Sequence, residues 1–319
     1  FRFSVVRFLL RSMYIVRNKK IFLSLSVLFI GLSIASIAFF GFSLGIDFTG
    51  GSLMEVSYQE KRPEREVLEG ALRELSLIPP LGQYSLRPTD DTGYILRTRT
   101  LNDEERAEVF EALSLPEMPA LLERFATVGP TVGEELRSKA LVAIVIVVLV
   151  IIFYIAFAFR NISKTDEKHI QYTPKLTSWK YGFVAVVALF HDIIVSVGVF
   201  AFLGFLLGAE ADILFVMALL AILGYSVNDT IVIFDRVRES VRENIEHNHK
   251  EPFTETLGRS LRASYARSIN TSLLLGGAST QIFAFILLVG VIAGTYSSLF
   301  LAPLLLLLFE ESARKKTQH

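Results

Sequence analysis

Hydrophobic residues are gathered in long blocks along this chain, and polar segments separate the blocks. The first block, 21–44, predicts a helix about 36 Å long, which is enough to cross a hydrocarbon core of about 30 Å. This block is longer than the apolar core of a signal peptide, so we interpret it as an uncleaved first span. Further blocks of spanning length lie at 140–159, 181–207 and 213–234. The pattern predicts a polytopic α-helical membrane protein.

The last apolar region, 266–309, is harder to divide into spans. Its turn-like break is Gly276-Gly277, which polar residues 279–281 follow. A helix over 268–275 would reach only about 12 Å. A fifth span is therefore short or broken, or begins earlier, or the sequence lacks a few residues there. Length alone would allow five spans rather than six.

Lysine and arginine gather in alternate connections between the apolar blocks. The basic segments are 1–20, 160–180, 235–265 and the tail 310–319. The turn at 208–212 has no basic residue and carries Glu210 and Asp212. Short basic segments stay on the cytoplasmic side of a membrane, so we expect both termini in the cytoplasm. An even number of crossings follows, and we predict six transmembrane helices.

The polar segment 45–139, between the first two spans, is expected to fold outside the cytoplasm. Its expected elements are a strand at 52–58, a helix at 63–75, a hairpin of 84–87 and 94–99, a helix opened by a capping box of Asn102 and Glu105, and a strand at 121–127. The order βαββαβ predicts a small ferredoxin-like α+β domain. Because it has no catalytic constellation, we interpret it as a docking module.

Composition narrows the function classes. Hydrophobic residues make up 52% of the chain and charged residues 20%, whereas a soluble domain has about 45–50% and about 25%. The 32 basic residues balance the 32 acidic ones, so no global field attracts nucleic acid. The absence of cysteine excludes disulfides and thiolate chemistry, and with five histidines we expect no metal and no cofactor.

Ionisable side chains inside a span cost about 2.5–3.5 kcal/mol each on insertion scales, so each needs a reason. Asp229 lies within the predicted span 213–234. The polar residues around it are Tyr225, Ser226, Asn228 and Thr230. We interpret Asp229 as a proton-exchanging acid, because bare helix packing favours small residues over a carboxylate. The alternative is a static pair that pins two helices together.

Four more residues complete the candidate proton pathway. His191 and Asp192 lie inside the span 181–207, and Arg267 opens the fifth apolar segment with Asn270 one turn deeper. Arg267 is the candidate cation that keeps Asp229 ionised until a proton arrives. The His-Asp step could instead form only local hydrogen bonds, and Arg267 could extend its side chain to the membrane surface.

Two intramembrane aspartates also suggest an aspartyl protease, in which two carboxylates share one proton. Here, however, their contexts are His-Asp and Asn-Asp, without the Tyr-Asp and Gly-x-Gly-Asp that such a protease requires. The sequence has no Gly-x-Ser-x-Gly and no Walker A loop either. We therefore do not expect an enzyme.

Four motifs in order resemble the SecD/SecF family, in its SecF branch. They are Gly45–Gly51, Val128–Leu136, Gly224–Glu239 and Gly294–Ser298. The motif residues singled out are Gly45, Asp47, Phe48, Gly50, Gly51, Gly129, Pro130, Gly133, Tyr225, Ser226, Thr230, Asp235 and Arg236. The motifs extend over essentially the whole chain, which makes the resemblance specific.

The resemblance implies an RND-like, proton-driven subunit of the cytoplasmic (inner) membrane. It implies pairing with SecD, as a separate or fused chain, beside the SecYEG channel, with the translocating preprotein, protons and membrane lipid as the other partners. By motif, the proton-carrying aspartate of the fourth span is Asp229 and the arginine of the fifth is Arg267. The rival interpretation is a non-conducting scaffold that stabilises SecD or the channel. The chain departs from the family pattern in its long, hydrophilic 160–180 connection and its short fifth span.

Overall fold

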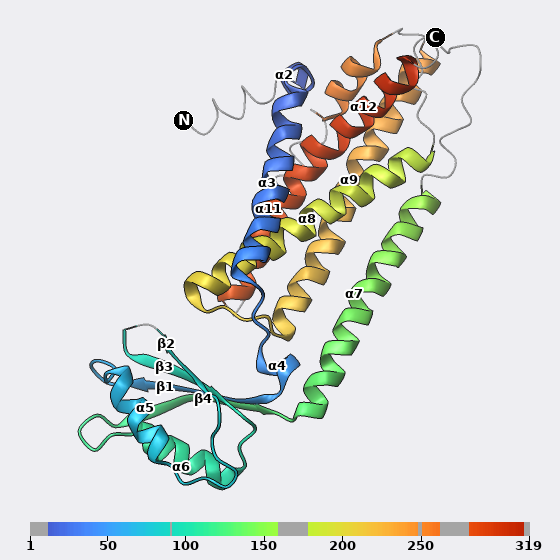
Figure 1. The fold of residues 1–319 in the computed structure, drawn as a ribbon. Helices are drawn as coiled ribbons and strands as arrows, with labels where there is room; N and C mark the ends of the chain where they lie inside the picture. Colours follow the sequence, from blue (N-terminus) through green and yellow to red (C-terminus); the bar gives the residue numbers. More distant parts are fainter. Residues whose placement is uncertain (1–11, 90, 159–177, 248–250, 262–280, 316–319) are drawn as a thin grey trace. The chain divides into compact units, whose positions relative to one another are not determined.

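The computed structural model in Figure 1 describes residues 12–89, 91–158, 178–247, 251–261 and 281–315. The chain divides into two compact units. The helical unit comprises 1–42, 144–209 and 214–319, and the sheet unit comprises 43–143 and 210–213. The short turn at 210–213, between two long helices, thus belongs to the sheet unit, which the sequence did not predict.

The described residues include five helical segments that are long and apolar enough to cross a membrane. They are α3 (Lys19–Phe40), α7 (Pro130–Ala158), α8 (Ser178–Leu207), α9 (Ile213–Glu246) and a continuous run of α11 (Gln281–Tyr296), the π-helix η2 (Ser297–Leu301) and α12 (Ala302–Lys315). A short helix α2 (Ser12–Arg17) precedes α3, and 253–261 is also helical. The predicted break at 276–281 and the start of the predicted fifth span fall largely outside the described residues.

Two of these helices extend beyond the apolar blocks that predicted them. Helix α7 begins at Pro130, well before residue 140, and α9 continues past Phe234 to Glu246. The extension of α9 is polar, and ion pairs between neighbouring turns support it. Arg236 pairs with Glu239 at 2.5 Å, and Arg242 pairs with Glu246 at 2.6 Å.

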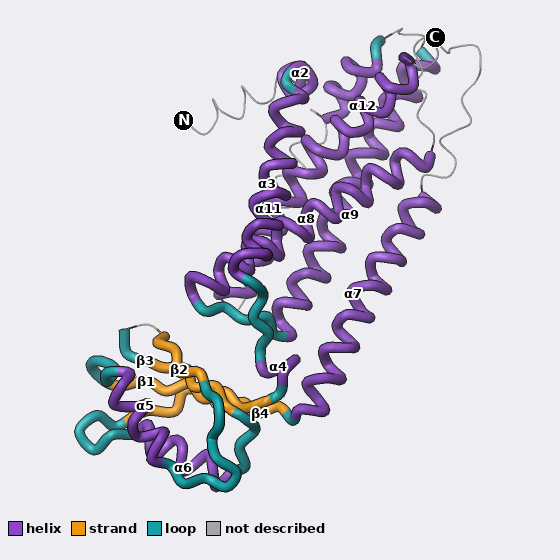
Figure 2. The backbone as a smooth tube through the Cα atoms, viewed as in Figure 1, coloured by secondary structure: helices purple, strands orange, loops and turns teal. Residues whose placement is uncertain are grey.

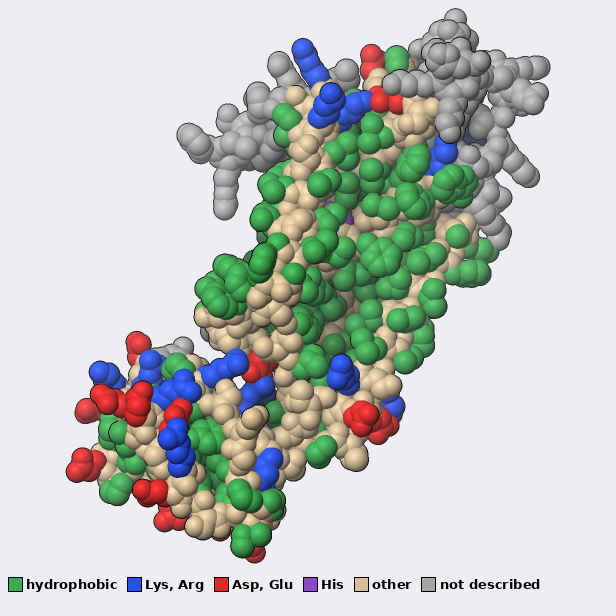
Figure 3. Space-filling view, in the orientation of Figure 1, with side chains coloured by type: hydrophobic (Ala, Val, Ile, Leu, Met, Phe, Trp, Pro, Cys, Tyr) green, Lys and Arg blue, Asp and Glu red, His purple; other side chains and the backbone are tan. Residues whose placement is uncertain are grey.

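Small residues let the helices of the helical unit approach closely. A Cβ atom on Gly290 of α11 would lie 2.2 Å from Cδ1 of Ile222 on α9. One on Gly198 of α8 would lie 2.3 Å from the Cβ atom of Ser33 on α3. Glycine at these crossings therefore sets the distance between helices, as is common where both partners are apolar. Figure 3 shows hydrophobic side chains over most of the visible surface of these helices.

The described residues of the sheet unit form four antiparallel strands and three short helices, which Figure 2 shows in orange and purple. In chain order they are α4 (Ile46–Thr49), β1 (Gly51–Tyr58), α5 (Arg65–Glu74), β2 (Ser85–Thr89), β3 (Gly93–Thr98), α6 (Asp103–Leu113) and β4 (Ala120–Val128). The strand order is β2-β3-β1-β4. Met54 in β1 pairs with Leu96 in β3 and with Phe125 in β4, so β1 is a central strand.

Alternation along β1 places Met54, Val56 and Tyr58 on the buried face of the sheet. The apolar faces of α5 and α6 pack on this face, with Leu72 and Val109 fully buried. The sheet unit therefore has its own two-layer core of strands and helices.

The capping box predicted at the start of α6 is present. The Asn102 side chain accepts a hydrogen bond from the Glu105 backbone N–H at 2.8 Å, and Glu105 Oε2 accepts one from the Asn102 N–H at 2.9 Å. Arg99 donates to both Glu105 oxygens, at 2.6 and 3.0 Å. The hydrogen bonds from Arg99 and from the Asn102 backbone hold the pKa of Glu105 below its ordinary value.

Candidate functional site: a buried polar seam and an anchored turn

A row of polar side chains is buried on one face of α9, inside the apolar helical unit. Asp229 and Thr230 stand three and four residues after Ser226, so both lie one helical turn from it on the same side of the helix. Their exposed fractions are 1%, 7% and 2%. The predicted polar stripe around Asp229 is therefore turned into the protein at these three positions.

Asp192 on α8 is the point where this row meets two other elements. Its Oδ2 atom accepts hydrogen bonds from Ser226 on α9 and from Ser297 on η2, the latter at 2.7 Å. Its Oδ1 atom lies 2.9 Å from Nδ1 of His191. The Asp192 carboxyl group is fully buried. Donors from three elements converge on it, an arrangement that suits an ionised, acceptor-only carboxylate.

A second contact lies beside the first. The hydroxyl groups of Thr230 on α9 and Ser298 on η2 are 2.8 Å apart. In an ordinary α-helix, successive side chains point about 100° apart, but η2 is a π-helix with a widened turn. There the adjacent Ser297 and Ser298 contact different helices, α8 and α9. Single π-helical turns of this kind are often found at functional sites.

We call the set formed by Asp192, Ser226, Asp229, Thr230, Ser297 and Ser298 the polar seam. His191 borders the seam and stacks against Tyr296 with ring centroids 6.0 Å apart. Ser196, one turn after Asp192, donates to the Asp192 carbonyl at 2.8 Å. The seam therefore joins α8, α9 and η2 by side-chain hydrogen bonds within helices of spanning length.

Of the remaining residues predicted for the proton pathway, the structure describes Asn228. Asn228 on α9 is exposed in this chain, because it points away from the face that carries Ser226 and Asp229. Of the family-motif residues on the same helix, Tyr225 is half-buried, and Asp235 and Arg236 are exposed on the extension of α9. Arg267 and Asn270 lie outside the described residues, so the pairing of Arg267 with Asp229 stays a prediction.

In the sheet unit, the turn at 210–213 is held by backbone hydrogen bonds to the first motif. The Gly45 N–H donates to the Ala211 carbonyl at 2.6 Å, and the Ala211 N–H donates to the Ser43 carbonyl at 2.9 Å. A Cβ atom on Gly45 would lie 2.9 Å from the Ala211 carbonyl oxygen. Glycine at this motif position therefore allows the close approach of the two backbones.

Side chains of the sheet hold the same turn. Glu210, nearly buried, forms ion pairs with Arg97 on β3 and with Arg87 on β2, the latter at 3.2 Å. Burial and the neighbouring Arg87 lower the pKa of Arg97 to about 10, against the opposing influence of two nearby acids, Asp47 and Asp212. Arg97 thus stays cationic at neutral pH, and the ion pair persists there.

Asp47, another residue of the first motif, contacts the start of α9. Its Oδ2 atom accepts a hydrogen bond from the Ile213 backbone N–H at 3.0 Å. The first N–H groups of a helix have no partner within the helix, so a carboxylate stabilises this end. We call Ser43, Gly45, Asp47, Arg87 and Arg97, together with the turn that they hold, the anchored turn.

Gly50 and Gly51 allow the chain to enter the sheet beside its point of exit. Both have positive φ angles, 72° and 116°, which L-residues with side chains rarely adopt. A Cβ atom on Gly50 would lie 2.8 Å from Cα of Pro130, the first residue of α7. One on Gly133 would lie 2.7 Å from the Gly50 nitrogen. The first two predicted motifs therefore meet in space.

Three residues of these sites could not be predicted from the spacing of residue types along the chain. Ser297 and Ser298 were visible only as part of a motif, because their direction depends on the π-helix. Glu210 was noticed for its charge, but nothing in the sequence connects it with Arg97. Within the described ranges, no group of three or more His, Asp or Glu side chains could hold a metal ion.

These features define a multi-pass α-helical membrane protein with a small sheet domain after its first span and a buried acidic site among its helices. Two family descriptions match the chain. "Protein export membrane protein SecD/SecF, C-terminal" covers residues 115–165 and 176–312, and "SecD/SecF GG Motif" covers 35–61. The chain therefore belongs to the SecD/SecF family.

Relatives agree with this assignment. The chain is 36% identical to the protein translocase subunit SecF of Thermobaculum terrenum, over 93% of each chain. It is 33% identical to that of Sebaldella termitidis, over 92% of this chain and 91% of the relative. The crystal structure of SecDF from Thermus thermophilus, described as a translocon-associated membrane protein, matches with a TM-score of 0.73 and 29% identity. The match covers 93% of this chain and 38% of the SecDF chain.

Proposed function

We propose that this chain is an accessory subunit of the Sec protein translocation machinery. Together with SecD, it uses the proton motive force to promote the export of preproteins across the cytoplasmic membrane. Family membership supports the place of the chain in protein export. The observation that carries the proton-driven part is the Asp192 carboxyl group, buried among spanning helices and bonded to three other side chains.

Protonation changes what this carboxyl group can do. An ionised carboxylate only accepts hydrogen bonds, whereas a protonated one also donates. Oδ2 of Asp192 accepts from both Ser226 and Ser297, and a proton on this oxygen would displace at least one of these donors. A buried donor left without a partner costs about 1–3 kcal/mol. Proton binding at the seam therefore favours a different packing of α8, α9 and η2.

Asp229 takes part in the same switch. It lies between Ser226 and Thr230 on the buried face of α9, and both of these neighbours bond to other elements. A change in its charge acts directly on the helix that carries these contacts. We assign proton exchange to both acids: Asp229 is the proton-carrying acid of α9, and Asp192, with His191 at its side, is the acid whose protonation changes the contacts between the helices. Arg267 and Asn270 are the proposed partners from the fifth span.

The anchored turn gives a route from the helices to the sheet domain. Helix α8 ends at Leu207 and α9 begins at Ile213, and Glu210 between them pairs with Arg87 and Arg97 of the sheet. A shift of α8 against α9 would therefore exert a force on the turn that these ion pairs hold. We propose that this connection transmits the switch to the domain, which in turn pulls on the preprotein.

The proposed topology has six transmembrane helices with both termini in the cytoplasm. The five described candidate spans and the basic segments of the sequence support it. We further propose that the sheet domain has the ferredoxin-like fold. The element order and the antiparallel strand order β2-β3-β1-β4 support that assignment.

SecD is the proposed partner in the membrane, and the fused SecDF chains among the relatives support this pairing. SecYEG, the preprotein, protons and membrane lipid complete the proposed set of partners. We propose no catalytic activity. An aspartyl protease needs a carboxyl pair that shares one proton, whereas the donors on Asp192 are an imidazole and two serine hydroxyls.

Gradient-dependent export by inverted membrane vesicles tests the proposal. The vesicles hold SecYEG, SecD and either the wild-type chain or Asp229→Asn. Asp235→Asn is the matched control, because it changes an exposed acid on the same helix. We expect Asp229→Asn to lose the gradient-dependent part of export and Asp235→Asn to keep it. If Asp229→Asn exports as well as the wild type, the chain is a scaffold rather than a proton-driven subunit.

A further inference from the structure

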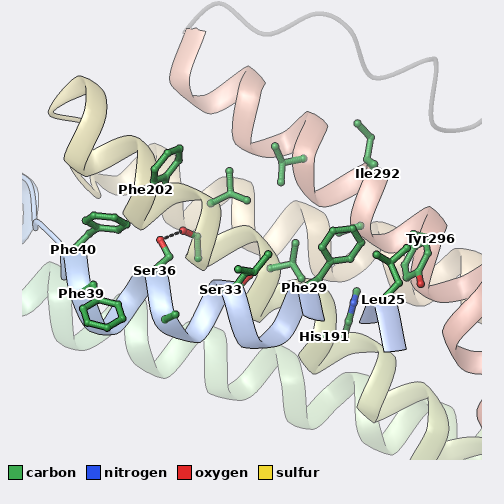
Figure 4. A pocket seen from close by; sticks show the side chains of 17 residues that line it. Leu25, Phe29, Ser33, Ser36, Phe39, Phe40, His191, Phe202, Ile292 and Tyr296 are labelled. Carbon is green, nitrogen blue, oxygen red and sulfur yellow. Dashed lines mark hydrogen bonds between the residues drawn. The ribbon is translucent and has the colours of Figure 1, made fainter. Parts of the chain in front are cut away.

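The helical unit has an elongated groove of about 760 Å³ between α3, α8 and α11 (Figure 4). This volume lies within the range of about 300–1,000 Å³ that is usual for ligand sites. The groove follows α3 from Leu25 to Phe40, a distance of about 22 Å along a helix. Its walls are almost entirely apolar, and aromatic side chains such as Phe29 and Phe202 contribute to them.

One end of the groove has a polar group. Figure 4 shows His191, Leu25 and Tyr296 together at this end, and Phe39, Phe40 and Phe202 at the other. The His191 side chain is only 1% exposed, and its Nε2 atom has no hydrogen-bond partner among the described residues. A buried ring nitrogen without a hydrogen-bond partner raises the free energy of the folded protein, so the binding of a ligand that supplies the partner is favoured.

The hydrogen bond on the other ring nitrogen sets the chemistry of Nε2. Nδ1 lies 2.9 Å from Oδ1 of Asp192, and an ionised carboxylate can only accept. Nδ1 then carries the hydrogen, and Nε2 presents a lone pair to the groove. The missing partner is therefore a hydrogen-bond donor.

Two of the other polar groups at the groove are already bonded. The Ser36 hydroxyl donates to the Gly198 carbonyl at 2.8 Å, and the Tyr296 hydroxyl donates to the Phe22 carbonyl at 2.7 Å. Of His191, Ser36 and Tyr296, only His191 has an open hydrogen-bonding position. A ligand that fits this pattern has a long apolar body and a single donor group at one end.

The groove opens to the outside of the helical unit. Phe39, Leu32 and Ile292 line it and are 84%, 58% and 60% exposed. Because these helices have spanning length, the opening faces lipid hydrocarbon. The polar end lies toward the start of α3, where Lys19 and Lys20 stand. A bilayer amphiphile would thus enter from the side with its polar group toward that end of the span.

We propose that this groove binds a long-chain amphiphile from the bilayer, with a terminal hydroxyl or protonated carboxyl group that donates a hydrogen bond to Nε2 of His191. The apolar chain lies along α3 toward Phe40. Occupancy fixes the His191 ring beside Asp192 and so connects membrane lipid with the polar seam. The binding itself does not depend on the proposed export function, and the test below measures binding alone.

Photolabelling of the full chain in lipid nanodiscs tests the proposal. The probe is 1-hexadecanol with a photoreactive diazirine in its chain, and mass spectrometry identifies the labelled peptides. We expect labelling of residues 25–40 and 191–202. Unlabelled 1-hexadecanol should compete about tenfold better than 1-methoxyhexadecane, which has the same chain but no donor, since a lost buried hydrogen bond of about 1.4 kcal/mol is a factor of ten.

Three variants sharpen the test. His191→Phe keeps a ring against Tyr296 but removes the acceptor, so the alcohol and the ether should compete equally. Ala35→Phe fills the groove and should abolish labelling at its walls. Val145→Phe, at an exposed position of α7 outside the groove, should label like the wild type.

Either of two results on the wild-type chain overturns the proposal without any variant. Equal competition by the alcohol and the ether shows that no donor is recognised. Loss of labelling when SecD is reconstituted with the chain shows that the groove is a protein interface. Undiminished labelling of the groove in Ala35→Phe likewise contradicts it.

Discussion

Ser297 in the π-helix η2 donates a hydrogen bond of 2.7 Å to Oδ2 of Asp192 on α8, and Ser226 on α9 donates to the same oxygen atom. One buried carboxylate oxygen therefore joins three elements of the helical unit. Each donor contributes about 0.5–1.5 kcal/mol net to stability in an ordinary case, and more when the acceptor is charged. The two bonds share one acceptor, so their contributions are coupled.

Removal of the two hydroxyls separately and together tests this coupling. We expect Ser226→Ala and Ser297→Ala each to lower the free energy of unfolding of the purified chain by about 1–3 kcal/mol, because each removes a hydrogen bond to the buried Asp192 carboxylate. The double variant should depart from the sum of the single effects by at least about 0.5 kcal/mol. Thermal unfolding in detergent micelles measures all four proteins. Strict additivity would show that the two serines do not share Asp192.

The double glycine at the entry of the sheet offers a test of backbone geometry. Gly50→Ala and Gly51→Ala place a Cβ atom at positive φ and within 2.8 Å of Pro130 and 2.6 Å of the Thr98 carbonyl oxygen, respectively. We expect each to cost about 1–3 kcal/mol, as strained backbone positions do. Gly129→Ala is the matched control, since nothing lies within 4 Å of its added Cβ atom. Equal melting temperatures for all three variants would contradict the proposed meeting of the two motifs.

Acid should weaken the start of α6. The pKa of Glu105 is held below its ordinary value of 4.5 by the hydrogen bonds from Arg99 and from the Asn102 backbone. A carboxyl group with a lowered folded-state pKa contributes stability that is complete above 4.5 and is lost as the pH falls through the lowered value. Wild type should therefore melt above Glu105→Gln at pH 6, and the difference should shrink toward pH 3. Glu108→Gln, an exposed change on the same helix, should show no such trend.

The ion pairs of the anchored turn should matter for export more than for folding. Glu210→Gln weakens the attraction to both Arg87 and Arg97. We expect gradient-dependent export to fall while the chain still assembles with SecD, because the turn no longer carries the motion of α8 and α9 into the sheet. Glu117→Gln, at an exposed position of the same unit, is the control. Export at the wild-type level by Glu210→Gln would exclude the turn as the route of transmission.

Much of the fold follows from local patterns in the sequence. The apolar blocks predict α3, α8 and α9 because each is a continuous run of spanning length. The alternation at 52–58 predicts β1, and Asn102 with Glu105 predicts the start of α6. The structure confirms these elements. They could be predicted because each signal is local in the sequence and does not depend on contacts with distant residues.

The parts of the site that the sequence does not predict depend on contacts between residues far apart in the chain. The inward direction of Ser297 and Ser298 results from a π-helix, for which their residue types give no signal. Glu210 forms an ion pair with Arg97 because the turn at 210–213 packs with the sheet unit. Asn228 is next to Asp229 in the sequence, but it is two residues from both Ser226 and Thr230, and a rotation of about 200° turns its side chain away from the seam.

Proton uptake during export tests the central claim most directly. A pH-sensitive dye follows protons that cross the membrane of vesicles with SecYEG, SecD and this chain while a preprotein is exported. With Asp229→Asn, and with Asp192→Asn if it assembles, we predict that the export-linked proton flux disappears, whereas Asp235→Asn retains it. A normal proton flux in Asp229→Asn would contradict the account, since the buried acid of α9 would then carry no proton.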